Sequence, residues 1–318
     1  MQPRALIGFD IGGTKSAVVL GDESGRIVAR RQVATGQPEP TMAALIDAAR
    51  ELAAGVDVRV RACGVSCGSP LSRERGLIQS PANLPGWVDV PVREMVQRAL
   101  PGVPFNLEND ADAAALAEWR WGLDRKLDDV IYLTCGTGQG AGLIIGGRLH
   151  RGTSSLAGEI GHVRLLPFGP VGCRKAGSVE GLTSGRALGE IAKIRLGEPH
   201  DATPLDDLPI AEVTGRHVAE AALAGDQFAA TVALELARHL GHACAILIDV
   251  LNPQRISLGS LALRLQPLPQ FIELVRFAAQ EEAMPGAFAA CTIDVAALGD
   301  RVQDLAALAA ASEAVANA

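Results

Sequence analysis

The sequence predicts an α/β protein of two lobes. The chain has 318 residues, and single hydrophobic cores stop growing near about 250–300 residues, so about two domains are expected. Short β-type runs alternate with helical patterns, and one design of strand, glycine-rich turn and strand occurs twice. We place the first lobe at residues 1–110 and the second at 111–299, with a C-terminal helix near 300–318 that packs back on the first. Two lobes imply a cleft.

Composition limits the function classes. Apolar residues make up 48% of the chain and aromatic residues only 3%, so the cores must be built from Ala, Leu, Val and Ile. The net charge of −7, without a Lys/Arg-rich block, argues against a nucleic-acid-binding surface. Met1-Gln2-Pro3-Arg4 leads straight into an apolar run that Asp10 interrupts too early for a signal peptide or membrane span. We expect a cytoplasmic protein that binds no membrane.

The six cysteines are scattered in mostly apolar surroundings. Reduced core thiols are therefore expected rather than a disulfide framework. They are Cys63, Cys67, Cys135, Cys173, Cys244 and Cys291.

Three β-type runs at residues 6–9, 16–20 and 26–30 open the first lobe and predict a meander. The turn between the first two reads Asp10-Ile11-Gly12-Gly13-Thr14-Lys15. Paired glycines let backbone N–H groups approach an anion, and the Thr14 and Lys15 side chains can donate to it. Taken alone, this turn is more simply interpreted as an ordinary hairpin.

The second copy of this design lies at residues 129–150. A run at 130–134 is followed by Gly136-Thr137-Gly138-Gln139-Gly140, a run at 141–145, Gly146-Gly147, and a run at 148–150. Two such hairpins in two lobes could hold a polyphosphate between them. The turns are not a Walker loop, because no G-x-x-x-x-G-K-S/T occurs, and they are not a Rossmann fingerprint, because the glycines join strand to strand.

Between the two hairpins, residues 40–54 predict a helix, 58–66 a strand and 91–100 another helix. The segment from 67 to 89 is rich in Gly, Pro, Ser and Asn. A loop of this length in a compact domain is often a binding loop, and Asn83-Leu84-Pro85-Gly86-Trp87 is its most informative part. A plain surface excursion explains the composition equally well.

An apolar segment at residues 105–107 ends in Glu108-Asn109-Asp110, where an Ala-rich helix begins. Asn109 is a good N-cap, and Asp112 stands where a carboxylate can meet the first-turn amides. Helix capping alone is one interpretation of these polar residues, and a functional carboxylate at a helix start is the other.

Helical patterns dominate the rest of the chain. They cover residues 184–196, 210–223, 227–251, 270–283 and 301–316, with short strands at 255–258 and 290–293.

The chain resembles the ROK family of bacterial sugar kinases. The resemblance rests on Asp10-Ile11-Gly12-Gly13-Thr14-Lys15, on Glu108 to Ala115, on the Gly138–Gly142 turn and on Gly158-Glu159-Ile160-Gly161-His162, in the right order over nearly the whole length. It implies a two-lobed actin-like (ribonuclease H-like) ATPase fold of the hexokinase type. It further implies ATP and Mg²⁺ as cofactors, a sugar substrate and usually a homodimer.

Carried over position by position, the resemblance implies that Asp110 is the base that takes the proton of a sugar hydroxyl. The sugar hydroxyls would be held by Asn83, Asn109, Glu159, His162 and Glu180. The nucleotide and its metal would be held by Asp10, Gly12, Gly13, Thr14, Lys15, Gly136, Thr137, Gly138 and Gly259. A bulky residue at Gly13 or Gly138 is then expected to weaken ATP binding far more than sugar binding, by meeting phosphate oxygens and forbidding a turn with positive φ.

Two motifs depart from the family. Typical members carry C-x-C-G-x-x-G-C-x-E after the histidine, and those cysteines with the histidine bind a structural zinc, whereas Val171 and Ser178 replace two of the cysteines here. A tetrahedral zinc site needs about four N/S ligands, and only His162 and Cys173 remain, so we predict no structural zinc. Ser260 replaces the second glycine of the pair that meets the adenosine.

These features leave two function hypotheses. The first is an ATP-dependent kinase of a hexose or a hexose derivative, glucokinase-like and acting at the 6-hydroxyl. The alternative is a sugar-binding sensor that kept the fold and lost turnover, which the lost zinc ligands favour and the retained Asp110 disfavours.

Overall fold

The computed structural model describes residues 4–56 and 58–316, so the expectation drawn from Met1-Gln2-Pro3 lies outside the described residues. The chain divides into two compact units. Unit 1 comprises residues 1–126 and 300–318, and unit 2 comprises residues 127–299. The division thus falls after Lys126 rather than after Asp110. The reason is that the helix beginning at Asp110 continues directly from a strand of unit 1 and packs against the C-terminal helix.

Unit 1 is built on a five-stranded sheet in the order β3-β2-β1-β4-β7. Its strands are β1 (Arg4–Ile11), β2 (Lys15–Gly21), β3 (Ile27–Ala34), β4 (Arg59–Cys67) and β7 (Phe105–Asn109). The first three are antiparallel neighbours, which confirms the predicted meander, while β1, β4 and β7 run parallel. Parallel strands bring their carboxyl ends to one edge of the sheet.

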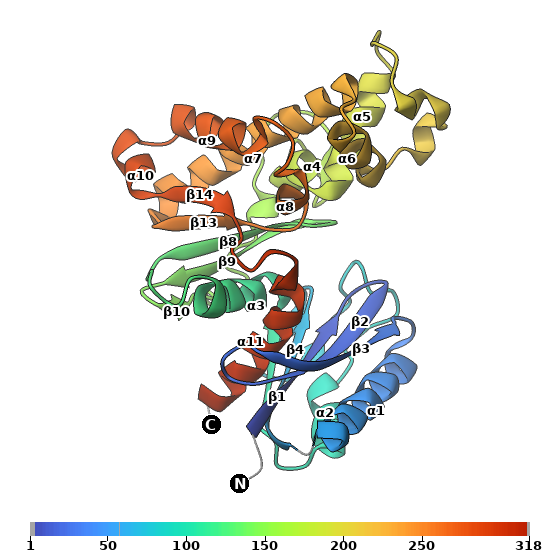
Figure 1. The fold of residues 1–318 in the computed structure, drawn as a ribbon, viewed down its shortest axis with the longest axis vertical. Coiled ribbons are helices and arrows are strands. Elements are labelled where there is room, and N and C mark those ends of the chain that lie inside the picture. The colour runs from blue at the N-terminus through green and yellow to red at the C-terminus, as the bar shows by residue number, and fades with distance from the viewer. Residues whose placement is uncertain (1–3, 57, 317–318) are drawn as a thin grey trace. The chain divides into compact units, whose positions relative to one another are not determined.

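Helices cover both faces of this sheet (Figure 1). They are α1 (Pro38–Val56), α2 (Val92–Ala99), α3 (Asp110–Ala117), the π-helical turn η1 (Glu118–Gly122), the 3₁₀ turn η5 (Gly299–Arg301) and α11 (Val302–Ala316). Helix α11 packs on β1 and β4 so closely that a Cβ added at Gly64 would lie 2.1 Å from the Ala311 nitrogen. The opposite face packs on α1, with Ile7 and Phe9 against Met42 and Leu45.

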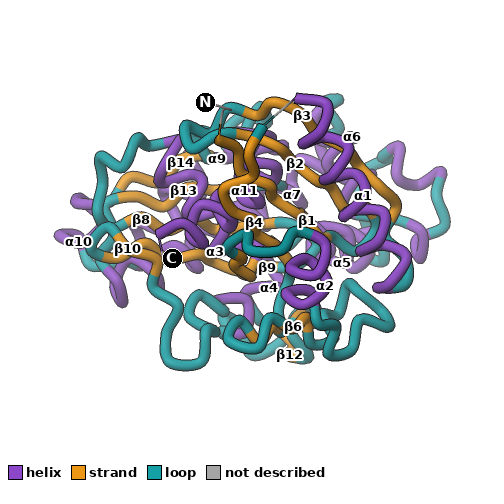
Figure 2. Tube along the Cα trace, turned by 90° about the horizontal axis from the view of Figure 1, so that it is seen from below, coloured by secondary structure: helices purple, strands orange, loops and turns teal. Residues whose placement is uncertain are grey.

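The predicted loop between β4 and α2 contains only the short strands β5 (Leu71–Ser72) and β6 (Leu77–Ile78), and Figure 2 shows β6 within a run of loop. It is nevertheless anchored. Leu84 and Trp87 are almost fully buried, and the Trp87 indole N–H donates to the Gly36 carbonyl at 2.9 Å. Asn83 therefore sits on a loop that the core holds in place.

Unit 2 repeats the sheet topology of unit 1. Its strands are β8 (Val130–Cys135), β9 (Gln139–Ile145), β10 (Arg148–Leu149), β13 (Arg255–Leu258) and β14 (Thr292–Val295), in the order β10-β9-β8-β13-β14. Again the first three pair antiparallel and the remaining pairs are parallel. The internal repeat predicted from the glycine-rich turns is confirmed as a repeated sheet.

The helices of unit 2 pack around one long central helix, α7 (Gln227–Leu251). The others are α4 (Val179–Thr183), α5 (Gly185–Leu196), α6 (Gly215–Leu223), α8 (Leu261–Leu265), α9 (Phe271–Glu282) and α10 (Pro285–Ala290), with 3₁₀ turns η2 (Ile160–His162), η3 (Pro204–Asp207) and η4 (Ile210–Glu212) and a hairpin of β11 (Val171–Gly172) and β12 (Lys175–Ala176). Helix α7 is long and apolar enough to cross a bilayer, but 61% of its apolar window is buried, as in a core helix. All six cysteines are free thiols, and four of them are buried.

Most predicted boundaries shift by a few residues, and two of these shifts have a local cause. The helix expected at 210–223 starts at Gly215, because residues 210–212 form a 3₁₀ turn that ends in extended backbone at Val213, and the Thr214 side chain caps the helix that follows. The strand expected at 290–293 lies at 292–295, since residues 285–290 form α10.

Candidate functional site

The parallel strands of unit 1 bring several predicted residues to one sheet edge. Ile11 at the end of β1 is level with Cys67 at the end of β4, and Cys67 is level with Asn109 at the end of β7. Asp10, Gly68 and Asp110 therefore lie at the same edge. A Cβ at Gly68 would lie 3.8 Å from an Asp110 carboxylate oxygen and 3.5 Å from the Asn83 side-chain oxygen. The loop asparagine and the helix-start carboxylate, 27 positions apart (110 − 83), meet at this point.

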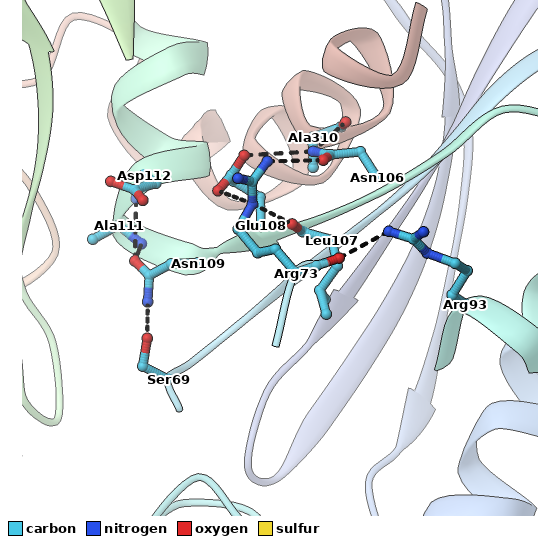
Figure 3. Close-up of polar contacts among 10 residues, drawn as sticks. All are labelled: Ser69, Arg73, Arg93, Asn106, Leu107, Glu108, Asn109, Ala111, Asp112 and Ala310. Carbon is cyan, nitrogen blue, oxygen red and sulfur yellow. Dashed lines mark hydrogen bonds and ion pairs between the residues drawn. The ribbon is translucent and has the colours of Figure 1, made fainter. Parts of the chain in front are cut away.

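Asn109 starts helix α3, as predicted. Its side-chain oxygen accepts hydrogen bonds from the Ala111 and Asp112 amides at 2.9 and 3.2 Å, and its amide nitrogen donates to the Ser69 hydroxyl at 2.9 Å (Figure 3). Asn109 thus takes the first-turn amides for which Asp112 was expected, and the Asp112 side chain is buried instead. The Ala111 amide also donates to one Asp110 carboxylate oxygen at 2.9 Å, so Asn109 and Asp110 share that amide.

Asp110 is accessible to solvent, yet the protein that surrounds it raises its pKa. The cause is the loss of hydrating water where the protein packs around the carboxyl group, and hydrogen bonds from Ala111 and Asn109 oppose it only in part. Asp10 is affected more clearly. Burial, and then the negative charges of Asp110 and Asp304, raise the pKa of Asp10 to about 7. Two carboxylates that repel each other across a sheet edge form an environment that a cation or a transferable proton would stabilise.

A buried ion pair that sequence reasoning missed lies directly behind this edge. Glu108 is fully buried, and its carboxylate accepts from the Arg73 guanidinium at 3.1 Å. Arg73 also donates to the Leu107 carbonyl at 2.9 Å and to the Asn106 side chain at 3.1 Å, and Asn106 in turn donates to the Ala310 carbonyl of α11 (Figure 3). The network ties the end of β7 to the loop after β4 and to α11. The only sign of this pair in the sequence is a glutamate, Glu108, at the end of a segment expected to be buried, directly before Asn109.

The first glycine-rich turn is exposed but tightly constructed. Thr35 holds it, because its hydroxyl donates to the Gly12 carbonyl at 2.7 Å and its amide donates to the Thr14 carbonyl at 3.1 Å. Neither glycine has a positive φ. A Cβ at Gly13 would lie 2.5 Å from the Asn83 carbonyl oxygen. The expectation that Gly13 needs a positive φ is therefore wrong, and the close neighbour in the structure is the loop that carries Asn83.

The second glycine-rich turn, in unit 2, packs closely against Glu180, as the first packs against the loop that carries Asn83. A Cβ at Gly138 would lie 2.7 Å from a Glu180 carboxylate oxygen, and the Gln139 amide donates to that oxygen at 3.3 Å. The other Glu180 oxygen accepts from the Cys173 amide at 2.8 Å. Gly138 also lacks a positive φ. Glu180, on α4, thus connects the turn after β8 with the β11–β12 hairpin.

A cavity of about 510 Å³ opens beside this turn within unit 2. Gly136, Thr137 and Ser260 contribute to its wall, together with Arg186 and Arg216 at the starts of α5 and α6. Gly259 itself does not line the cavity, and a Cβ there would strike the Tyr132 hydroxyl at 2.0 Å. The cavity has the size of a small-molecule site, with cationic groups and glycine backbone at its wall.

Comparison with known proteins agrees with this geometry. The model of the ROK family matches residues 6–311. This chain belongs to the ROK family. A glucokinase from Streptomyces coelicolor is 36% identical over 265 residues, which is 80% of each chain. Among solved ROK structures, a glucokinase from Streptomyces griseus in complex with glucose and AMPPNP matches with a TM-score of 0.78 and 33% identity, covering 97% of this chain and 99% of its own. A Thermus thermophilus hexokinase matches with a TM-score of 0.82 and 33% identity, covering 98% and 99%.

The family membership and the two-lobed α/β fold of actin-like ATPases, both expected from the sequence, are thereby confirmed. Within unit 1 the structure brings together Asp10, Asn83, Asn109 and Asp110 and the Gly12-Gly13 turn. Lys15 begins β2 with an exposed side chain. Within unit 2 it brings together Glu159, His162, Glu180 and the Gly136–Gly138 turn.

The zinc-binding pattern of ROK proteins does not fit the residues present here. His162 and Cys173 are its only remaining donors, Val171 is exposed and Ser178 is fully buried. The nearest carboxylate to the His162 ring is Glu159, whose oxygen lies 3.9 Å from Nε2. Among residues 4–56 and 58–316, no cluster of three or more His, Cys, Asp or Glu side chains could hold a metal ion. The donor set is too small for tetrahedral zinc.

Proposed function

We propose that this ATP-dependent sugar kinase of the ROK family transfers the γ-phosphoryl group of ATP to the 6-hydroxyl of a hexose or hexose derivative, as a glucokinase does. The observation that carries the proposal is the placement of Asp110. It is a solvent-accessible carboxylate with a raised pKa, next to a second carboxylate and held by a capped helix start. A base with this environment can accept the hydroxyl proton as the oxygen attacks phosphorus.

The sugar hydroxyls are assigned to side chains of both units. Asn83 and Asn109 would act in unit 1, and Glu159, His162 and Glu180 in unit 2. Three of the five are held by their surroundings: Asn83 by the buried Leu84 and Trp87, Asn109 by Ser69, and Glu180 by two backbone amides. Preorganised polar groups of this kind discriminate epimers, because an absent hydroxyl leaves them unpaired.

The phosphoryl donor is assigned to the glycine-rich turns and the cavity of unit 2. Its wall of glycine backbone, Thr137 and the Arg186 and Arg216 side chains suits a nucleotide. Mg²⁺ keeps several waters and needs only one or two carboxylates besides phosphate oxygens. Asp10, with the Asp110 carboxylate near it, would therefore suit that ion. When bound, the metal would neutralise charge on the transferred group.

The deciding experiment measures ADP release over a panel of hexoses, N-acetylhexosamines and amino sugars, with ATP and Mg²⁺. We expect turnover with at least one sugar and a 6-phosphate product by NMR. Sugar binding by calorimetry without ADP release would contradict the proposal and would identify the protein as a sensor.

We further propose that the enzyme acts as a cytoplasmic homodimer. Val250, Phe277 and Met284, on or beside α7, α9 and α10, are 73%, 52% and 68% exposed. These helices contact one another, and we assign these three exposed apolar side chains to the surface that a second copy would cover. Light scattering should give the mass of a dimer, and a monomer mass at micromolar concentration would contradict this assignment.

A further inference from the structure

We propose that Ser178, assisted by Lys175, is a positioning residue that holds the sugar-binding side chains His162 and Glu180 without a metal. The inference rests on the proposed assignment of those two residues to the sugar. It goes beyond that assignment because it names what fixes them in a chain that lacks the donors for zinc.

Ser178 occupies one of the replaced cysteine positions and is fully buried. Its hydroxyl donates to the Gly172 carbonyl at 2.8 Å and accepts from the Gly181 amide at 3.1 Å. The first bond closes the β11–β12 hairpin onto α4, and the second caps α4, the helix that carries Glu180. One side chain thus joins the two segments that a metal would otherwise connect.

The backbone around Ser178 completes the connection to η2, which carries His162. The Val179 amide donates to the Val163 carbonyl at 2.8 Å, and the Leu165 amide donates to the Gly177 carbonyl at 2.9 Å. Figure 2 shows that β12 lies in a long run of loop. Outside the short β11–β12 pair, these backbone bonds therefore hold the segment together.

Lys175 reaches η2 directly from the hairpin. Its ammonium donates to the His162 carbonyl at 2.8 Å. On the other side of the hairpin, the Cys173 amide donates to Glu180 at 2.8 Å. His162 and Glu180 are therefore both hydrogen-bonded to the hairpin, and Ser178 fixes the hairpin itself. Buried and charge-assisted hydrogen bonds orient the groups they hold, because leaving any partner unpaired is unfavourable.

The test compares Ser178→Ala with Thr183→Val. Thr183 is equally buried on the same helix, but its hydroxyl bonds only to the Val179 carbonyl within that helix. We expect Ser178→Ala to raise the sugar KM about tenfold with kcat within about threefold, as for lost ground-state positioning. Thr183→Val should lower the melting temperature without this change in KM. Equal KM values for the two variants would overturn the proposal.

Lys175 offers a second, independent measurement if Ser178→Ala fails to fold. Lys175→Met should raise the sugar KM, and Lys175→Arg should restore part of the loss, because the guanidinium can still donate to the His162 carbonyl. No difference between Met and Arg at this position would contradict the role assigned to Lys175.

Restoring the metal tests the idea from the opposite direction. Val171→Cys with Ser178→Cys supplies two further thiols beside Cys173 and His162. Elemental analysis should then find one zinc per chain, and a zinc-selective chelator should weaken sugar binding by calorimetry in this variant only. Stoichiometric zinc in the unaltered protein, or a chelator-dependent fall in its melting temperature, would overturn the inference.

These outcomes separate the inference from the proposed function. Turnover of a hexose with an unchanged KM in Ser178→Ala would leave the kinase assignment intact and refute the positioning role. Conversely, an absence of turnover with every sugar would refute the kinase assignment, while the metal content and the chelator response would still test how the hairpin is held.

Discussion

The two units share one sheet topology but differ in what stands at the ends of the strands. The penultimate residue of the first strand is Asp10 in unit 1 and Thr134 in unit 2, and the residue after the last strand is Asp110 in unit 1 and Ala296 in unit 2. At these two positions unit 1 has carboxylates and unit 2 has neutral residues, and the carboxylate nearest to the turn after β8 in unit 2 comes from Glu180 on α4. The comparison teaches that the repeated sheet supplies the edge, while the residues placed on it differ, and we propose that only those of unit 1 include the base.

The units also differ in how they hold their functional residues. In unit 1 a buried ion pair, Arg73 with Glu108, lies behind the edge. In unit 2, Glu180 and His162 are held by amides, one hydroxyl and one ammonium on short loops. The following changes test whether this division is real.

The largest effect is expected at Asp110. Asp110→Asn keeps the shape of the side chain but cannot accept the hydroxyl proton, so turnover should fall about 10²–10⁴-fold while sugar binding by calorimetry stays close to that of the unaltered protein. Asp124→Asn, which changes an exposed carboxylate paired with Lys126, is the control and should keep full turnover. Retention of more than about a tenth of the activity in Asp110→Asn, where a base contributes about 10²-fold or more, would show that Asp110 is not the base.

Next in size is the loss of the buried ion pair. Arg73→Met leaves the fully buried Glu108 without its cation, which should lower the unfolding free energy by about 3–5 kcal/mol in denaturant titrations. Arg195→Met in unit 2 removes an exposed pair with Glu235 and should cost less than about 1 kcal/mol. The double variant Arg73→Met/Glu108→Met should recover part of the loss. A double variant no more stable than Arg73→Met alone would show that the charge of Glu108 is not what destabilises the single variant.

The charge at the edge of unit 1 should also appear in the pH dependence of stability. The pKa of Asp10 is raised from its ordinary 3.8 to about 7, so between these values the folded state keeps a proton that the unfolded state has lost. The contribution of Asp10 to stability therefore falls as pH rises from about 4 to about 7. Asp10→Asn removes this loss, and its melting temperature should exceed that of the unaltered protein more at pH 8 than at pH 5. The scans are run without Mg²⁺ or nucleotide, whose binding would add stability of its own. A difference that does not vary with pH would contradict the raised pKa.

The sequence predicted what local patterns encode. Helix α7 at 227–251 and strand β13 at 255–258 have the predicted bounds, because apolar periodicity and flanking breakers act within a few residues. Asn109 was found as a cap for the same reason. The Arg73–Glu108 pair was not, since its members are 35 positions apart (108 − 73) and meet only when β4 and β7 align.

The glycine-rich turns also show that local patterns do not predict contacts with distant segments. Both were found, but neither Gly13 nor Gly138 has the positive φ that was expected. Their nearest neighbours are Asn83 and Glu180, which belong to distant segments, so substitutions there should disturb the proposed sugar residues as well as the nucleotide. A side chain at either glycine thus no longer separates ATP binding from sugar binding as the sequence alone suggested.

The smallest expected effect sharpens the comparison within unit 2. Ser260, at the cavity wall, has φ 50° and ψ −112°, which suits glycine and costs an L-residue on the order of 1–3 kcal/mol. Ser260→Gly relieves this strain but adds freedom to the unfolded chain, so a net gain of about 1 kcal/mol is expected as a raised melting temperature. Gln270→Gly is the matched control. Gln270, at φ 65° and ψ 0°, lies nearer the left-handed region that other residues tolerate, so its gain should be smaller. If Ser260→Gly gained no more than Gln270→Gly, the backbone of the unit 2 cavity would be unstrained, and the serine there would need another explanation, which the nucleotide KM of the variant would then test.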